Sequence, residues 1–260
     1  MGHAFGAPDF YDRNDKKTGG DFIGTGWWDL MANGNHNDGG HSPAHPNPYV
    51  KTEIFKWATA KELVGYDSLY TLRPSELDSN SIYKLSTSTP GEYYLLENRQ
   101  DPKIPGIGLV VYHVNASIED VASSKINIKH PQNLYVVDAN NHVEKPTGSV
   151  ESYGDINTMY APFWNYYSEN MYFTSTSKPS NCAWDGTPTE NKDVCLFEIG
   201  KGFWKKQEQY GENQKICVLM SGEYYTGIGY SKNVDFYDIK GVTEELLDYL
   251  GYNGRYSFVM

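Results

Sequence analysis

The sequence has few cysteines, no long apolar run and a shortage of basic charge. Its 260 residues include 3 Cys, and no two of them form a Cys-x-x-Cys pair, so we expect no cysteine-based zinc site. No apolar stretch approaches the roughly 18 residues that a membrane span requires. Lys and Arg total 22 against 33 Asp and Glu. Because phosphate backbones are bound by clustered basic side chains, this balance predicts no nucleic-acid partner.

The amino terminus lacks the pattern of a signal peptide. Met-Gly-His-Ala-Phe-Gly contains no basic segment followed by an apolar core. The odd number of cysteines argues against a disulfide framework. Cys182 and Cys195 flank a polar loop and could pair, which would leave Cys217 free; the alternative is that no disulfide forms.

Aromatic residues and glycine are abundant, with 22 Tyr, 6 Trp and 25 Gly. Aromatic and Thr-rich segments between Gly, Pro and Asn turns are typical of β-strands. Short alternating patterns predict strands at residues 83–86, 92–97, 108–114, 134–137, 196–199 and 216–220.

Two helices are expected from periodicity and capping. Residues 49–63 predict an amphipathic helix with Val50, Ile54, Phe55 and Trp57 turned inward. Residues 243–250 begin a second helix, with Thr243 as its N-cap.

These patterns predict an α+β protein with three parts. Residues 1–65 would form one domain, residues 66–235 a β-rich, sandwich-like domain, and residues 236–260 a carboxy-terminal helix and tail.

The most informative stretch lies at the start of the chain. His3, Gly6 and Asp9 have the spacing in which a helical His ligand is followed by a Gly turn and then by a third ligand. Imidazole and carboxylate groups are competent zinc ligands. A hydrolytic zinc site also needs another ligand and a general base. The His-Glu pair that would supply both lies, in such a motif, immediately before Met1.

The flanking residues strengthen this interpretation. Gly2-His3, Gly6, Pro8-Asp9, Tyr11-Asp12, Trp28-Asp29-Leu30-Met31 and Gly34 together resemble the immune inhibitor A type (M6) of secreted metalloproteases. The resemblance continues through His45, Tyr49, Lys51 and Trp57, through Glu97-Asn98-Arg99, and through Tyr112-His113-Val114 and His130-Pro131. It covers roughly residues 1–140 well and the rest loosely.

The resemblance implies the carboxy-terminal part of a metzincin-like catalytic domain followed by a β-rich domain. It further implies a secreted zinc endopeptidase acting on protein or peptide substrates, with His3 and Asp9 as zinc ligands and Met31 in the turn beneath the metal. The residues expected to support this site are Gly6, Pro8, Trp28, Asp29, His45, Glu97 and Arg99. Without the first His and the Glu base, the chain as written is expected to be inactive. Either an upstream portion is missing or the chain is a degenerate relative.

Calcium is a second candidate cofactor. Asp12, Asn14, Asp15 and Asp21 lie in a Gly-containing loop and offer the oxygen ligands that Ca²⁺ prefers, although their spacing does not match an EF-hand. The alternative is a solvated acidic loop. Asp138, Asp155 and Asn157 are weaker candidates.

Other polar residues have structural explanations. His36, His41 and His45 invite a metal interpretation, but their Asn-, Gly- and Pro-rich loop favours solvated side chains. Glu97 and Arg99 could form a partly buried ion pair. The surplus of Trp and Tyr leaves open a non-catalytic module that binds carbohydrate or protein, although core packing explains most of these residues.

Overall fold

The structure is a computed structural model that describes most of the chain. The described residues are 2–14, 22–63, 69–101, 106–115, 125–139, 163–164, 173, 175, 177–187, 189, 194–206, 209–221, 223–227, 230–233 and 235–257. Within these residues, none of the helices is long and apolar enough to cross a membrane.

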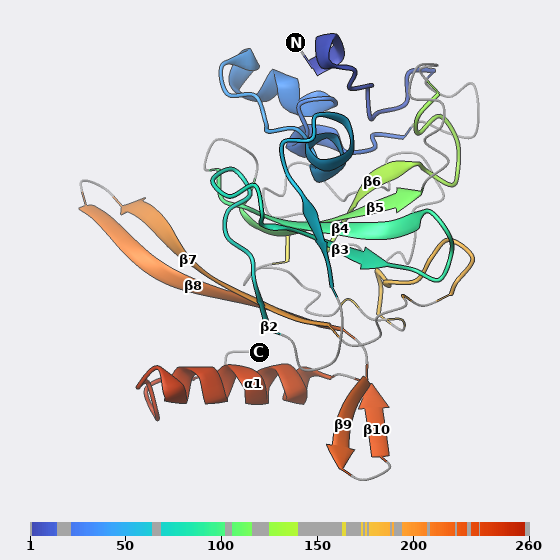
Figure 1. Cartoon of the computed structure of the whole chain (residues 1–260). Helices are drawn as coiled ribbons and strands as arrows, with labels where there is room; N and C mark the ends of the chain where they lie inside the picture. The colour runs from blue at the N-terminus through green and yellow to red at the C-terminus, as the bar shows by residue number, and fades with distance from the viewer. Residues whose placement is uncertain are drawn as a thin grey trace.

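A five-stranded sheet forms the centre of the molecule (Figure 1). Its strands are β1 (Ala60–Glu62), β3 (Ile82–Ser86), β4 (Glu92–Arg99), β5 (Gly108–Asn115) and β6 (Leu134–Val137), in the order β1-β3-β4-β5-β6. β1 runs parallel to β3, and the other neighbouring strands are antiparallel. The sequence pattern therefore predicted the four antiparallel strands to within two residues.

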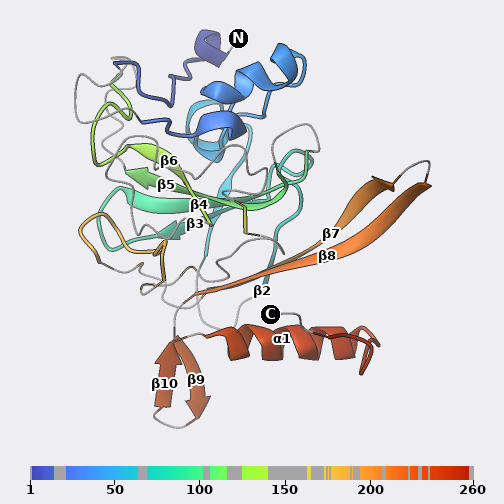
Figure 2. The ribbon, with the colours of Figure 1, turned by 180° about the vertical axis from the view of Figure 1, so that it is seen from behind.

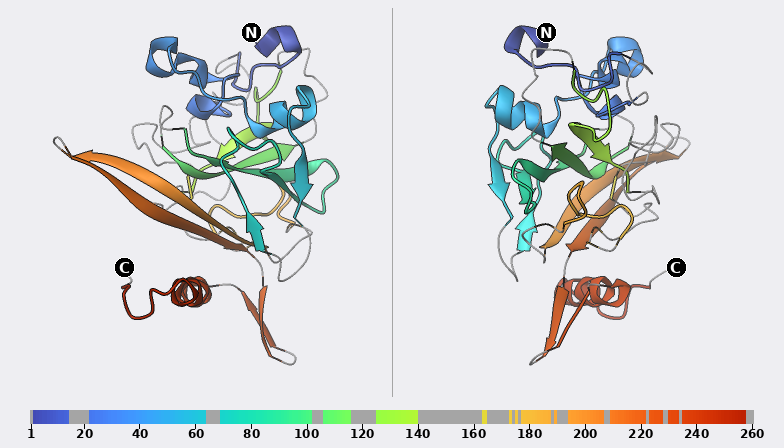
Figure 3. Two further views of the ribbon diagram at one scale, coloured as in Figure 1. Left: turned by 60° about the vertical axis from the view of Figure 1, so that its left-hand side comes forward. Right: turned by 90° about the vertical axis from the view of Figure 1, so that its right-hand side faces the viewer.

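The amino-terminal residues form short helices over one face of this sheet (Figures 1 and 3). Among the described residues of this part are the 3-10 helices η1 (Gly2–Phe5), η3 (Gly26–Trp28) and η4 (Asn33–Gly40) and a π-helix, η5 (Val50–Ile54).

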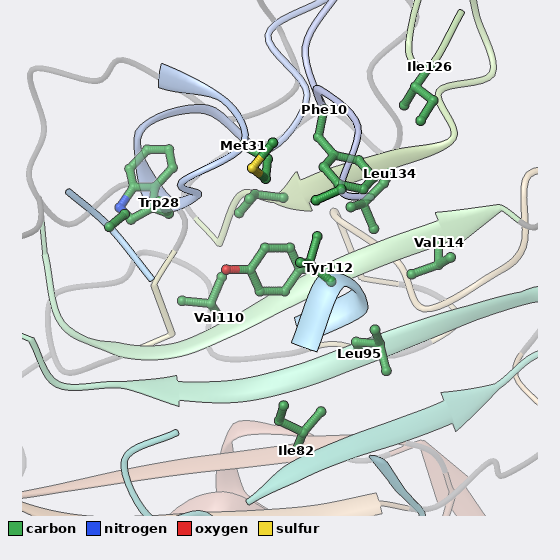
Figure 4. Packing of buried hydrophobic residues seen from close by; sticks show 14 of the residues in the cluster. Phe10, Trp28, Met31, Ile82, Leu95, Val110, Tyr112, Val114, Ile126 and Leu134 are labelled. Carbon is green, nitrogen blue, oxygen red and sulfur yellow. The ribbon is translucent and has the colours of Figure 1, made fainter. Parts of the chain in front are cut away.

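Alternating side chains of the sheet build two hydrophobic clusters. On the face below the short helices, Leu95, Val110 and Tyr112 pack with Phe10, Trp28 and Met31 (Figure 4). The intervening positions Tyr94, Leu96 and Val111 belong to a second cluster on the other face, which also contains Trp164 and Phe173. Because side chains on both faces of β4 and β5 pack into a hydrophobic cluster, the two strands are buried along almost their whole length.

The carboxy-terminal part contains two hairpins and a helix. β2 (Leu69–Thr71), β7 (Val194–Lys206) and β8 (Gln209–Ser221) form a sheet in that order, and β9 (Glu223–Gly227) pairs with β10 (Tyr230–Asn233). Helix α1 (Phe236–Tyr249) follows β10 at the end of the molecule opposite the amino terminus (Figure 2). Its first turn is closed by a capping box between Asp235 and Asp238.

Both predicted helices differ from the observed ones. The helix predicted at residues 49–63 ends after η5, because Lys56 takes a positive φ of 57° and the chain then enters β1. Trp57, predicted to face inward, is 59% exposed. In α1 the N-cap is Asp235 and not Thr243, which lies inside the helix and donates to the Ile239 carbonyl.

The architecture is mixed α/β around a five-stranded sheet. Nothing in it points to a metzincin-like domain, so the metzincin-like domain, the sandwich-like domain and the division into three domains stay predictions.

Cys182 is a buried free thiol, so the suggested pairing with Cys195 does not form.

Candidate functional site

The turn after η1 brings the two predicted zinc ligands together. His3 Nε2 lies 3.1 Å from Asp9 Oδ1, and His3 Nδ1 lies 2.9 Å from the Ala7 carbonyl oxygen. Because a carbonyl only accepts, Nδ1 carries the proton, and in a neutral ring Nε2 would keep its lone pair. Arg13 Nη1 lies 3.2 Å from the second oxygen of Asp9.

Two arrangements fit this geometry. A protonated His3 would form an ordinary ion pair with Asp9. Alternatively, a cation could lie between a neutral imidazole and the carboxylate: two ligands at about 2.0 Å from a tetrahedral zinc are about 3.3 Å apart, close to the observed 3.1 Å. Within the described residues, no group of three or more His, Cys, Asp or Glu side chains could hold a metal ion. The pair therefore fits half of a tetrahedral zinc site.

Gly6, Pro8 and Met31 lie close to the His3–Asp9 pair in the structure. Gly6 ends η1 with a φ of 87° and donates to the His3 carbonyl, and buried Pro8 precedes Asp9. Met31 packs against Gly2 so closely that a β-carbon added there would lie 2.2 Å from the Met31 sulfur. The Met31 carbonyl accepts from the Phe10 amide at 2.9 Å, which ties the turn to the residue after Asp9.

Asp29 holds the turn that contains Met31. It is fully buried and accepts hydrogen bonds from the Thr25 hydroxyl at 2.6 Å, the Met31 amide at 3.1 Å, and both the amide and the side chain of Asn47 at 2.9 and 2.7 Å. Burial raises the pKa of Asp29, and these hydrogen bonds oppose that shift. Trp28, beside it, is also fully buried. Both residues are structural supports.

The acidic loop is only partly described. The Asn14 amide donates to Asp12 Oδ1 at 2.8 Å, which is a local turn contact, and Asp12 is buried. Asp15, Asp21, Asp155 and Asn157 lie outside the described residues. The calcium site therefore stays a prediction.

The three loop histidines do not come together as ligands within the described structure. His36 and His41 are exposed, as expected for solvated side chains. His45 is half-buried, and burial lowers the pKa of its imidazole, with Lys51 and Arg99 adding to the effect.

Glu97 and Arg99 form the predicted ion pair at 2.7 Å, but both are fully buried. Glu97 also accepts from Lys51 at 2.8 Å, Ser75 at 2.7 Å and Tyr112 at 2.9 Å. Arg99 reaches Glu76 at 3.1 Å and donates to the Trp28 and His45 carbonyls at 3.0 and 3.3 Å. The network joins the sheet to the short helices.

Burial alone would raise the pKa of Glu97, but the charges of Lys51 and Arg99 outweigh it and lower the pKa to about 2. Burial lowers the pKa of Lys51, and Glu97 opposes that shift. Burial also raises the pKa of Glu76, against the attraction of Arg99. A carboxylate held ionised in this way serves structure and is a poor proton acceptor.

A second buried polar cluster was not predicted from the sequence. His113 is stacked between Tyr94 and Trp184, with ring centroids 4.4 and 5.3 Å away. Its Nε2 lies 2.7 Å from Glu92 and its Nδ1 lies 3.0 Å from the Tyr135 hydroxyl. The Trp184 amide donates to the same Glu92 oxygen at 2.6 Å. The only sequence signal was a His within an otherwise apolar strand.

Comparison with known proteins matches the carboxy-terminal part of the chain. The family "Phenylalanyl tRNA synthetase beta chain CLM domain" matches residues 187–260. The phenylalanine–tRNA ligase β subunit of Shouchella clausii is 36% identical over 75 residues, which cover 26% of this chain and 9% of that protein. The corresponding subunit of Thermotoga maritima is 38% identical over 68 residues, again 26% and 9%. That of Protochlamydia amoebophila is 38% identical over 64 residues, or 24% and 8%.

The chain thus spans less than a tenth of the length of these relatives. No solved structure matches it.

These matches correct the assignment made from residues 1–140. Residues 187–260 are similar to the phenylalanyl-tRNA synthetase β chain, and the matches do not support the resemblance to the M6 metalloproteases. The expected function, a zinc endopeptidase acting on proteins or peptides, is therefore wrong, and the alternative of a carbohydrate- or protein-binding module is not supported either. A spacing of one His, one Gly and one Asp specifies a local turn, which many families can contain.

The exclusion of a nucleic-acid partner is overturned in the same way, because the matched relatives are named for their action on a tRNA. Net charge is an average over the whole chain. It does not exclude a segment that works inside a larger enzyme of this kind. The expected extracellular location rested on the rejected family and stays a prediction.

Proposed function

We propose that residues 187–260 serve as a segment of a phenylalanine–tRNA ligase β subunit, and that the chain acts in attaching phenylalanine to tRNA as part of that enzyme. The observation that carries this proposal is the match of these residues to the β chain family. Its agreement with relatives from three bacteria supports the same conclusion.

The fold supports the proposal through the position of the matched segment. Residues 187–260 contain both hairpins, β7–β8 and β9–β10, together with α1. The two hydrophobic clusters of the central sheet draw their residues from positions 7 to 184. Within the match, β7 and β8 pair with each other along their whole length, and from outside it β2 joins β7 at Cys195–Phe197.

The chain matches less than a tenth of the length of its relatives. We therefore expect it to act within a larger assembly. The test is a segment exchange. In the Thermotoga maritima β subunit, the segment that aligns with this chain is replaced by residues 187–260, and the attachment of phenylalanine to tRNA is measured. We expect the exchanged enzyme to keep charging activity.

The matched control carries an equally long piece of this chain from before residue 187, inserted at the same place. It should assemble poorly or fail to charge tRNA. The proposal fails if the exchanged subunit folds and assembles, as judged by melting temperature and gel filtration, but charges no more tRNA than the control.

We also propose that His3 and Asp9 bind a divalent transition metal, with zinc as the first candidate. The 3.1 Å separation of His3 Nε2 and Asp9 Oδ1 and the contact of His3 Nδ1 with the Ala7 carbonyl support this, because metal-bound histidines usually donate their other ring proton in this way. The positive charge of Arg13 beside Asp9 opposes metal binding, so we expect weak affinity.

Calorimetric titration of the whole chain with zinc tests this second proposal. His3→Gln and Asp9→Asn should each abolish the binding isotherm, whereas His36→Gln, which changes an exposed histidine, should leave it unchanged. Zinc binding that survives both His3→Gln and Asp9→Asn would place the metal elsewhere.

A further inference from the structure

The sequence contains two Asn-Gly pairs, Asn33-Gly34 and Asn253-Gly254. Asn is among the heat-labile residues of proteins, because its side-chain amide can react with the backbone nitrogen of the next residue. A following glycine makes this reaction easiest, since glycine has no β-carbon to shield its nitrogen. The two pairs lie in contrasting surroundings.

The Asn33-Gly34 pair is enclosed by the fold. It begins η4, where Gly34 is buried, and the Gly34 amide donates to the Asp29 carbonyl at 3.1 Å. The space around Gly34 is full: a β-carbon added there would lie 2.6 Å from the Asp29 carbonyl oxygen and 2.8 Å from the Ala44 β-carbon. A nitrogen whose proton is held in this hydrogen bond cannot attack while the turn stays closed. Reaction at Asn33 therefore requires local opening of η4.

The Asn253-Gly254 pair is open to water. It lies in the turn that follows α1 (Figure 3), where the Arg255 amide donates to the Tyr252 carbonyl at 2.8 Å. Both residues of the pair are exposed, and among the described residues outside its chain neighbours no atom lies within 4 Å of a β-carbon added to Gly254. Within the described part of the chain, neither the Asn253 side chain nor the Gly254 amide has a hydrogen-bond partner.

We propose that Asn253 is a modification site, at which water removes the side-chain amide through a cyclic imide formed with Gly254. The Gly254 nitrogen loses its proton to a solvent base and attacks the side-chain carbonyl carbon of Asn253. A new C–N bond forms, the bond to the side-chain nitrogen breaks, and that nitrogen takes a proton from water and leaves as ammonia. A second water then opens the five-membered ring at either carbonyl, which gives Asp or its isomer isoaspartate.

The product changes the carboxy-terminal surface of the chain. Both products place a new carboxylate near Arg255, which is exposed. In isoaspartate the backbone runs through the side-chain carbon, so the turn after α1 also becomes one carbon longer. This chemistry needs only water and does not depend on the proposed ligase function.

Incubation of the whole folded chain in warm neutral buffer, followed by trypsin cleavage and mass spectrometry, tests the proposal. Cleavage after Lys240 and Arg255 releases residues 241–255, in which Asn253 is the only Asn. We expect this peptide to gain one mass unit and to separate into Asp and isoaspartate forms on chromatography. Its rate should be roughly tenfold or more above the rate at Asn33, which reacts only from an opened state. In urea both pairs lose the fold around them, and their rates should agree within about threefold.

Asn253→Gln is the matched control, because one more methylene group would require a less favourable six-membered ring. It should stop the mass gain in residues 241–255 and leave the rate at Asn33 unchanged, and circular dichroism should show that the variant folds. The proposal is overturned if Asn253 of the folded chain reacts no faster than Asn33. It is equally overturned if Asn253 reacts more than about tenfold more slowly in the folded chain than in urea, because the turn would then protect the pair. Neither result bears on the charging activity of the segment-exchanged ligase.

Discussion

Replacing Glu97 by Gln should severely destabilise the protein, because it leaves two buried cations without their carboxylate. Glu97 lies 2.8 Å from Lys51 and 2.7 Å from Arg99, and all three side chains are at most 6% exposed. Gln has nearly the same shape and keeps hydrogen-bonding capacity toward Ser75 and Tyr112. The change therefore removes charge with little change in packing.

Two estimates give the size of the effect. Holding the pKa of Glu97 at about 2 instead of 4.5 corresponds to roughly 3 kcal/mol in favour of the ionised carboxylate. Removing one partner from a buried ion pair costs about 3–5 kcal/mol. Both are a large fraction of the 5–15 kcal/mol or so that stabilises an ordinary domain.

The assay is urea unfolding of both proteins at neutral pH, followed by tryptophan fluorescence. We expect Glu97→Gln to lower the free energy of unfolding by about 3–5 kcal/mol. A variant that replaces Lys51, Glu97 and Arg99 by Met and also Glu76, the other partner of Arg99, by Gln should lose much less, because no charge is then left buried alone. The reasoning is refuted if Glu97→Gln changes the free energy of unfolding by less than about 0.5 kcal/mol.

The same carboxylate predicts a dependence on pH. Since its folded pKa lies below the ordinary value of 4.5, ionised Glu97 stabilises the fold fully above pH 4.5, and this contribution is lost as the pH falls from 4.5 toward about 2. Glu97→Gln should therefore flatten the dependence of unfolding free energy on pH in that interval.

Three further substitutions test the local structure. Gly2→Ala places a β-carbon 2.2 Å from the Met31 sulfur and should cost about 1–3 kcal/mol, measured by thermal unfolding; an unchanged melting temperature would mean that Met31 moves freely. Asp29→Ala removes the acceptor of four buried hydrogen bonds and should cost about 2–4 kcal/mol in urea unfolding. Asp235→Ala removes the N-cap of α1 and should cost about 0.5–2 kcal/mol, seen as lost helical circular dichroism; full helicity would show that the cap is dispensable.

The sequence pattern predicted the central strands well because the alternation that marks a strand is visible within a few consecutive residues. The alternation in residues 92–97 and 108–114 follows directly from one side chain in two facing each hydrophobic cluster. The turn at Gly6 and the approach of His3 to Asp9 likewise follow from residues a few positions apart.

The remaining features depend on contacts that spacing does not reveal. Pattern identified only residues 196–199 and 216–220 of β7 and β8, whereas mutual pairing extends each strand to thirteen residues. The helix at residues 49–63 was overpredicted because apolar periodicity continued past the left-handed turn at Lys56. The cap at Asp235 was missed because its capping box uses Asp238 in place of the usual Glu or Gln.

The cluster around His113 assembles residues as distant in sequence as Glu92 and Trp184. The family assignment failed for a related reason. It relied on a short motif near the amino terminus, whereas the informative similarity lies in residues 187–260, where the sequence was interpreted only as late strands and a helix.

The central claim is that residues 187–260 function as a phenylalanine–tRNA ligase β-subunit segment. Its most direct test is the rate at which the Thermotoga maritima ligase carrying this segment attaches phenylalanine to tRNA. We predict a rate within about tenfold of the unaltered enzyme, equivalent to a loss of at most about 1.4 kcal/mol of transition-state stabilisation. A correctly assembled enzyme that charges tRNA no faster than the control carrying a piece from before residue 187 would contradict the claim.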